Sequence, residues 1–96
     1  MIEIEFDDAK RDITLAMRGL DMARAAEVFE GQTLTFEDVR REYSEPRYIT
    51  IGYLNARLVY LVWTPRASRR RIISLRKANG RERILYGPRL EANRVG

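Results

Sequence analysis

Arginines surround a short apolar run near the carboxyl end of the chain, in the segment RRRIISLRKANGRERILY, residues 69–86. A guanidinium group binds phosphate oxygens through two parallel hydrogen bonds, so the segment suits the chemistry of phosphate esters. We expect Arg76 and Arg83 to clamp a phosphate, with Arg47 as a further candidate. The same arginines would also suit the solvated edge of an ordinary fold or a clamp for nucleic acid.

Few side chains of this sequence can move a proton near neutral pH, because the chain contains neither His nor Cys. Glu82 and Lys77 are the available acid–base groups, and each would need a shifted pKa to work at pH 7. Tyr86 lies one helical turn after Glu82, so both side chains can face the same site. The phenol of Tyr86 could then stack on a nucleobase or donate a proton. There are structural alternatives. Glu82 could complete a capping box with Asn79. Lys77 could solvate a strand end, and Tyr86 could close the core.

Composition excludes several classes of protein. A chain of 96 residues, with 45% hydrophobic and 33% charged residues, suits one small globular domain. Without Cys or His we expect no disulfide, zinc site or serine triad, and no metal or cofactor. No apolar run approaches the roughly 18 residues of a membrane span. The acidic start MIEIEFDDAK lacks the apolar core of a signal peptide, so we expect a cytoplasmic protein that binds no membrane.

The charges are unevenly distributed along the chain. Residues 1–48 hold 12 acidic and 7 basic residues, whereas residues 49–96 hold 2 acidic and 11 basic residues. A half-chain this basic suits an anionic partner such as a nucleic acid. The alternative is that the two halves neutralise each other within the fold.

Periodicity and capping residues predict the first two elements. Residues 2–6 alternate apolar and acidic side chains, as a half-buried strand does. The pair Asp7-Asp8 supplies the cap of a helix that runs to about Arg18. Ile13 and Met17 lie four residues apart and form the apolar face that this helix is expected to bury.

A second helix is predicted from a cap at Asp21 to a stop at Gly31. Its apolar stripe consists of Met22, Ala25, Ala26 and Phe29. β-branched and aromatic residues then predict four strands, with a polar loop between the first two, and a short helix that ends at Gly87-Pro88. The strands cover residues 33–36, 47–53, 57–64 and 69–76, the loop covers 37–46 and the helix covers 80–86.

These elements predict a two-layer α+β domain with the order β-α-α-β-β-β-β-α. The last three strands form an antiparallel meander, and the two amino-terminal helices bury their stripes on one face of the sheet. Residues 1–88 form this single domain. Residues 89–96 are predicted to be a flexible tail.

Several motifs are similar to those of the BrnT toxin family. The segment FDDAKRDITLAMRGLDMARAAEVFEG resembles the amino-terminal motif of that family, and RYITIG and VWT resemble its strand motifs. The most specific match is the ending RIISLRKANGRERILY, and the resemblance covers about residues 6–86. The positions that fit this ending are Arg71, Ile72, Ile73, Ser74, Arg76, Lys77, Ala78, Glu82, Arg83 and Tyr86.

The resemblance implies a RelE-like fold and a ribonuclease activity that stops translation. BrnT proteins are toxins of bacterial type II toxin–antitoxin pairs. The expected partners are therefore an RNA substrate and a BrnA-like antitoxin with a ribbon-helix-helix part. The complex of toxin and antitoxin would bind operator DNA and repress its own operon.

RNA cleavage by attack of the 2′-OH needs positive charge around the phosphate. The further residues expected to bind RNA or its phosphates are Lys10, Arg18, Arg47, Thr64, Arg71 and Ser74. Some have structural alternatives, because Ser74 and Thr64 also suit ordinary strand positions and Lys10 suits a solvated helix face.

The sequence departs from the family pattern at the end of the first helix. Met17-Arg18-Gly19 stands where the family commonly has Lys-His-Gly, and Thr14 stands at the position of an Asn. Arginine stays protonated in proteins, so Arg18 cannot replace a histidine as a base, although it can bind a phosphate. The alternative prediction is a weak or inactive family member that serves as a binding module for the antitoxin and operator DNA.

Overall fold

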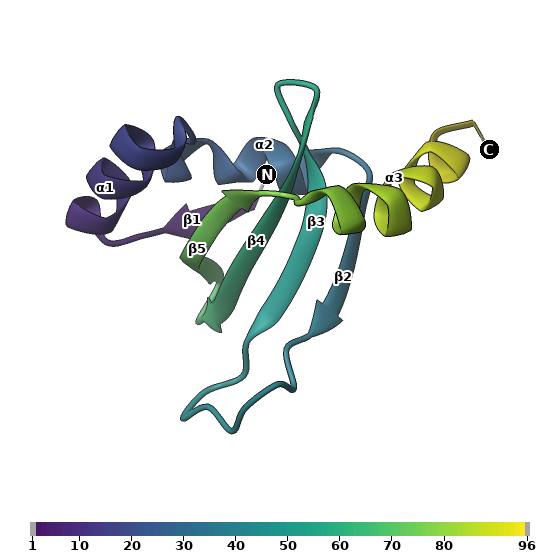
Figure 1. Cartoon of the computed structure of the whole chain (residues 1–96). Coiled ribbons are helices and arrows are strands. Elements are labelled where there is room, and N and C mark those ends of the chain that lie inside the picture. Colours follow the sequence, from purple (N-terminus) through teal and green to yellow (C-terminus); the bar gives the residue numbers. More distant parts are fainter. Residues whose placement is uncertain (1, 96) are drawn as a thin grey trace.

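The structure is a computed structural model that describes the backbone of residues 2–95 and the side chains of residues 2–91. Figure 1 shows a curved sheet with helices at one edge and on both faces. The elements in chain order are β1 (Glu3–Glu5), α1 (Asp8–Arg18), the 3-10 helix η1 (Met22–Arg24), α2 (Ala25–Glu30), β2 (Thr33–Glu37), β3 (Tyr48–Leu54), β4 (Arg57–Arg66), β5 (Arg69–Lys77) and α3 (Gly80–Val95). The predicted α+β class is confirmed. The predicted second helix is divided into η1 and α2.

The predicted antiparallel meander of the last three strands is confirmed, but the sheet as a whole is mixed rather than antiparallel. Strands β2 to β5 pair antiparallel in the order β5-β4-β3-β2, but β1 pairs parallel to β5. This register places Glu3 opposite Arg69 and Glu5 opposite Arg71. The side chains of both pairs approach, with N–O distances of 3.2 and 4.0 Å. Complementary charge therefore favours a pairing between strands far apart in sequence, which local patterns do not reveal.

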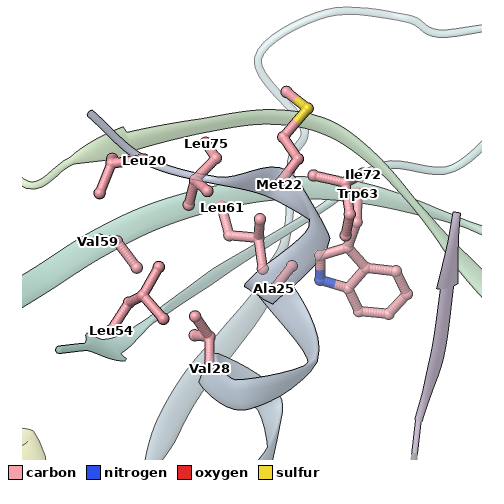
Figure 2. Close-up of a cluster of buried hydrophobic side chains, with 10 residues drawn as sticks. All are labelled: Leu20, Met22, Ala25, Val28, Leu54, Val59, Leu61, Trp63, Ile72 and Leu75. Carbon is pink, nitrogen blue, oxygen red and sulfur yellow. The ribbon is translucent and has the colours of Figure 1, made fainter. Parts of the chain in front are cut away.

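The first core lies between α2 and one face of the sheet. It contains the ten buried residues labelled in Figure 2, and Ala25 and Val28 of α2 face β3 and β4 there. Gly52 of β3 allows this close approach, because a Cβ atom at that position would lie 2.9 Å from Cγ1 of Val28. The prediction that the second helical segment packs on one face of the sheet is thus confirmed.

Helix α1 lies beside the edge of β5, and the prediction for its buried stripe is wrong. Ile13 and Met17 are 62% and 80% exposed, whereas Thr14 is buried. The reason is the short β1 strand, which pairs only with the first residues of β5 and leaves the following edge open. Lys10 and Arg18 of α1 donate hydrogen bonds to backbone carbonyls along that edge.

Helix α3 packs on the opposite face of the sheet from α2. Helices therefore cover both faces of the sheet, and the predicted two-layer arrangement is wrong. Leu90 is fully buried there in a second core, and Tyr86 packs against it. In Figure 1, α3 crosses in front of β3 and β2 near one end of the sheet. The predicted end at Gly87-Pro88 is wrong, because the helix continues through Pro88 to Val95. Proline removes one backbone donor, and burial of Leu90 offsets this loss.

The second core is formed by alternate residues of β3 and β4 together with residues of α3. Its buried members are Ile49, Ile51, Leu58, Tyr60, Val62, Ala78 and Leu90. The predicted tail, residues 89–96, begins within α3, and the side chains of its last five residues lie outside the described residues. No helix within residues 2–95 has both the length and the apolar composition needed to cross a membrane.

Candidate functional site

Arg76 is the central cation of a polar cluster on the α3 face of the sheet. It projects from β5, and its guanidinium carbon lies 3.9 Å from the centre of the Tyr60 ring on β4. Glu82 of α3 holds the same guanidinium through two hydrogen bonds, from Nη1 to Oε1 at 2.8 Å and from Nη2 to Oε2 at 2.9 Å. The ring and the carboxylate therefore fix both the position and the plane of Arg76.

Glu82 also caps α3, so the structural alternative for this residue is confirmed. Its Oε1 accepts a hydrogen bond from the backbone N–H of Asn79, and the Asn79 side chain accepts one from the backbone N–H of Glu82, each at 2.8 Å. The bond from Arg76 is the main cause that lowers the pKa of Glu82. Glu82 is therefore a fully ionised carboxylate at neutral pH.

Arg40 adds a second cation to this cluster, and sequence reasoning missed it. Asp38 is only 4% exposed and accepts hydrogen bonds from Nε and Nη2 of Arg40, each at 2.7 Å. Tyr43 donates a further hydrogen bond to Asp38 at 3.0 Å. The bonds from Arg40 hold the pKa of Asp38 well below its usual range despite burial. The available signal was an aspartate two residues before the arginine, a spacing that lets Asp38 bind the Arg40 backbone N–H.

Arg40 and Arg76 lie close enough for their charges to interact at Tyr60. Burial raises the pKa of Tyr60, and the charges of Arg40 and Arg76 oppose that rise. The pKa of Arg76 is raised chiefly by its hydrogen bonds with Glu82, and repulsion from Arg40 partly opposes this. The phenol of Tyr60 therefore keeps its proton at neutral pH, under the influence of both guanidinium charges. We call Arg40, Tyr60, Arg76 and Glu82 the arginine cluster.

Tyr86 stacks on Phe36 of β2, with ring centres 6.0 Å apart and ring planes at 25°. Phe36 remains 38% exposed, so this aromatic pair reaches the surface of the α3 face. Tyr86 also packs against the second core, which agrees with its structural alternative. Of the five residues predicted to be catalytic, the structure places Arg76, Glu82 and Tyr86 on this face.

Lys77 and Arg83 belong to a different cavity. Successive strand residues point to opposite faces, so Lys77 points away from the arginine cluster. Both residues line a cavity of about 590 Å³ beside the β3–β4 hairpin, together with Arg57. Arg83 donates a hydrogen bond to the backbone carbonyl of Ala78 at 3.1 Å. The structure thus separates these two predicted catalytic residues from Arg76.

Lys10, Arg18 and Ser74 lie together in a groove between α1 and β5. Lys10 Nζ donates to the carbonyl of Ile73 at 2.6 Å, and Arg18 Nη1 donates to the carbonyl of Leu75 at 2.9 Å. These residues were predicted to bind phosphate, and the structure brings them together at the edge of the sheet.

The other predicted phosphate-binding residues make structural contacts. Thr64 is buried and donates to the carbonyl of Pro46 at 2.6 Å. Arg71 lies beside Glu5, and the Arg47 guanidinium carbon lies 4.3 Å from the centre of the Tyr43 ring. Among residues 2–91, no group of three or more acidic, His or Cys side chains is placed to hold a metal ion.

A family model described as "Ribonuclease toxin, BrnT, of type II toxin-antitoxin system" matches residues 6–82. The chain belongs to the BrnT toxin family. No curated protein matches the sequence. Membership identifies the chain as a ribonuclease toxin of a type II toxin–antitoxin system, and an antitoxin partner follows from that class. The match includes Arg40, Arg76 and Glu82, and it ends before Arg83 and Tyr86.

Proposed function

We propose that this BrnT protein is a metal-independent endoribonuclease and that the arginine cluster is its active site. The observation that carries the proposal is a pair of guanidinium groups whose charges both act on Tyr60, each held by two hydrogen bonds from a carboxylate. Asp38 binds the Nε and Nη2 atoms of Arg40, which leaves the Nη1 donors for a phosphate oxygen. Preorganised donors of this kind stabilise a crowded phosphorane without rearranging during the reaction.

The proposed reaction is attack of the ribose 2′-oxygen on the adjacent phosphorus. The bond between phosphorus and the 5′-oxygen breaks, which gives a 2′,3′-cyclic phosphate and a 5′-hydroxyl end. Arg76 and Arg40 bind the non-bridging oxygens and stabilise their growing negative charge. The exposed aromatic pair of Phe36 and Tyr86 offers a platform on which a base can stack.

Glu82 is proposed to position Arg76 rather than to act as the base. Its carboxylate already accepts three hydrogen bonds, and these lower its pKa and therefore its basicity. Since the chain has no His, the proton of the 2′-OH passes to solvent hydroxide, and water protonates the 5′-oxygen. Catalysis is then mainly electrostatic.

In the cell, the proposed outcome of RNA cleavage is inhibition of translation. We infer a RelE-like fold and a BrnA-like ribbon-helix-helix antitoxin, whose complex with the toxin binds operator DNA and represses the operon. Both inferences are supported by membership of the family. We also propose that the protein acts in the cytoplasm, where an RNA substrate is available.

Two observations favour the alternative, a binding module without activity. Arg40 and Arg76 are each neutralised by a carboxylate, and Arg18, at the family's His position, donates to the carbonyl of Leu75. An inactive protein would still bind its antitoxin.

The test is cleavage of a defined single-stranded RNA in the presence of EDTA by the wild-type protein and two matched variants. Arg76→Ala should lower the rate by about 10²- to 10³-fold, the usual loss for one preorganised donor. Arg24→Ala is the control, since Arg24 makes a similar double hydrogen bond with Glu27 on α2, at the other face. Equal rates for the wild type and Arg76→Ala would refute the proposed site, and no cleavage by wild type would favour the binding module.

A further inference from the structure

Helix α1 carries apolar side chains that the described structure leaves mostly exposed. Ile13 and Met17 are 62% and 80% exposed and lie one turn apart. In a monomeric protein, large apolar side chains grouped in this way commonly mark a protein interface.

These side chains border a groove rather than a flat surface. The groove has a volume of about 380 Å³ and runs between α1 and β5. Met22, which belongs to the first core, contributes to its lining, and Ile73 and Ser74 contribute the β5 side. Its dimensions suit a few apolar side chains of a partner segment.

Two cationic side chains, Lys10 and Arg18, line the groove. Lys10 and Arg18 donate to backbone carbonyls, and within residues 2–91 neither forms an ion pair with a carboxylate. Arg40 and Arg76, by contrast, are each paired with an acidic side chain. The groove therefore combines an apolar border with uncompensated positive charge.

We propose that this groove is a docking site for the antitoxin, which inserts an apolar segment flanked by acidic residues. The inference rests on the toxin–antitoxin class of the family and adds the location and chemistry of the contact. Acidic residues of the partner pair with Lys10 and Arg18, while its apolar side chains cover Ile13 and Met17.

Charge and side-chain chemistry favour this occupant over two others. A second copy of the chain, paired through the same groove, would place Lys10 and Arg18 of both copies against each other, and like charges disfavour such a contact. RNA bases stack on aromatic rings, whereas the exposed apolar side chains of the groove, Ile13 and Met17, are aliphatic or a thioether. An acidic, amphipathic protein segment satisfies both features.

The test measures binding of the antitoxin, taken as the purified product of the open reading frame adjacent to the toxin gene. Its dissociation constant is determined by calorimetry for wild type, for the double variant Ile13→Glu/Met17→Glu and for Ile84→Glu. Ile84 lies on α3 and is 79% exposed, so it is a control for the addition of an exposed glutamate. RNA cleavage without antitoxin is measured in parallel for wild type and the double variant.

We expect the double variant to bind at least about 30-fold more weakly, the loss typical of a central interface residue, with unchanged RNA cleavage and melting temperature. The control should bind within about twofold of wild type. Binding of the double variant at wild-type strength, or no binding by wild type, overturns the proposal. Loss of RNA cleavage with unchanged antitoxin binding would assign the groove to RNA instead. Because binding is read directly, an inactive wild-type protein refutes the proposed catalysis but not this docking site.

Discussion

The substitution Glu82→Gln separates a positioning role from a role as general base. Glutamine keeps the side chain's shape but places an NH₂ group where Oε2 now accepts from Nη2 of Arg76. One charge-assisted hydrogen bond is lost, which is worth about 1.5–3 kcal/mol. If all of that loss appears in the transition state, cleavage falls by about 10- to 150-fold.

The pH profile gives the sharper result. Hydrogen bonding with Arg76 lowers the pKa of Glu82 from its ordinary 4.5, so this group does not change protonation between pH 6 and 9. With solvent hydroxide as the base, the rate rises about tenfold per pH unit across this range. The variant should show the same slope at a lower rate, because Glu82 only holds Arg76 in place.

Single-turnover cleavage of a short RNA between pH 6 and 9 provides the measurement, with circular dichroism to confirm that the variant is folded. A general base with a low pKa would instead be fully ionised throughout and give a flat profile. A flat wild-type profile that acquires a slope in Glu82→Gln would refute the positioning role and identify Glu82 as the base.

Three further predictions concern the support of Arg40, the packing of α2 and the pH dependence of stability. Asp38→Asn should lower the free energy of unfolding by about 1–3 kcal/mol, because the buried charge that binds Arg40 is lost. The same variant should cleave RNA more slowly. An unchanged thermal midpoint and cleavage rate would contradict the proposed support of Arg40. Gly52→Ala should cost about 1–3 kcal/mol of unfolding free energy through overcrowding, whereas Gly87→Ala, with open space at its Cβ position, should not destabilise; urea titrations compare the two. The hydrogen bond from Arg11 lowers the pKa of Asp21 from 3.8 to about 2. This interaction therefore adds at most about 2 kcal/mol to the free energy of unfolding above pH 4, and the gain is lost as the pH falls toward 2. Asp21→Asn should lower stability at pH 7 and reduce the fall in stability on acidification, and an identical pH dependence in wild type and variant would contradict this.

Local patterns predicted much of the chain's secondary structure. Asp7 caps α1 through the Lys10 backbone N–H, and Gly19 ends it with a left-handed φ of 69°. Alternation located the first strand, and β-branched and aromatic residues located the other four. The capping box of Asn79 and Glu82 is present as predicted. Each of these features depends on residues within a few positions of one another, which is why sequence suffices.

Features that depend on distant contacts were not predictable in this way. The parallel pairing of β1 with β5 joins residues more than sixty positions apart. The stripe of Ile13 and Met17 has helical spacing, but spacing does not reveal that α1 lies at an edge rather than on a face. Helix α3 passes Pro88 because Leu90 reaches the second core, a tertiary effect.

The candidate site was predicted only in part for the same reason. Arg76 and Glu82 lie six residues apart and were both identified, whereas Arg40 comes from a loop that sequence alone describes only as polar. Lys77 was predicted as an acid–base group of the same site from its residue type, yet strand geometry directs Lys77 and Arg76 to opposite faces. Proximity in space, rather than residue type, decides membership of the arginine cluster.

A double-mutant cycle on Arg40 and Arg76 tests most directly whether the two hold one phosphate. Cleavage of a defined RNA in EDTA is measured for wild type, Arg40→Ala, Arg76→Ala and the double variant. If both guanidinium groups stabilise the same transition state, the double variant should lose clearly less activity than the product of the two single losses. Losses that multiply, or an Arg40→Ala variant as active as wild type, would contradict a shared site.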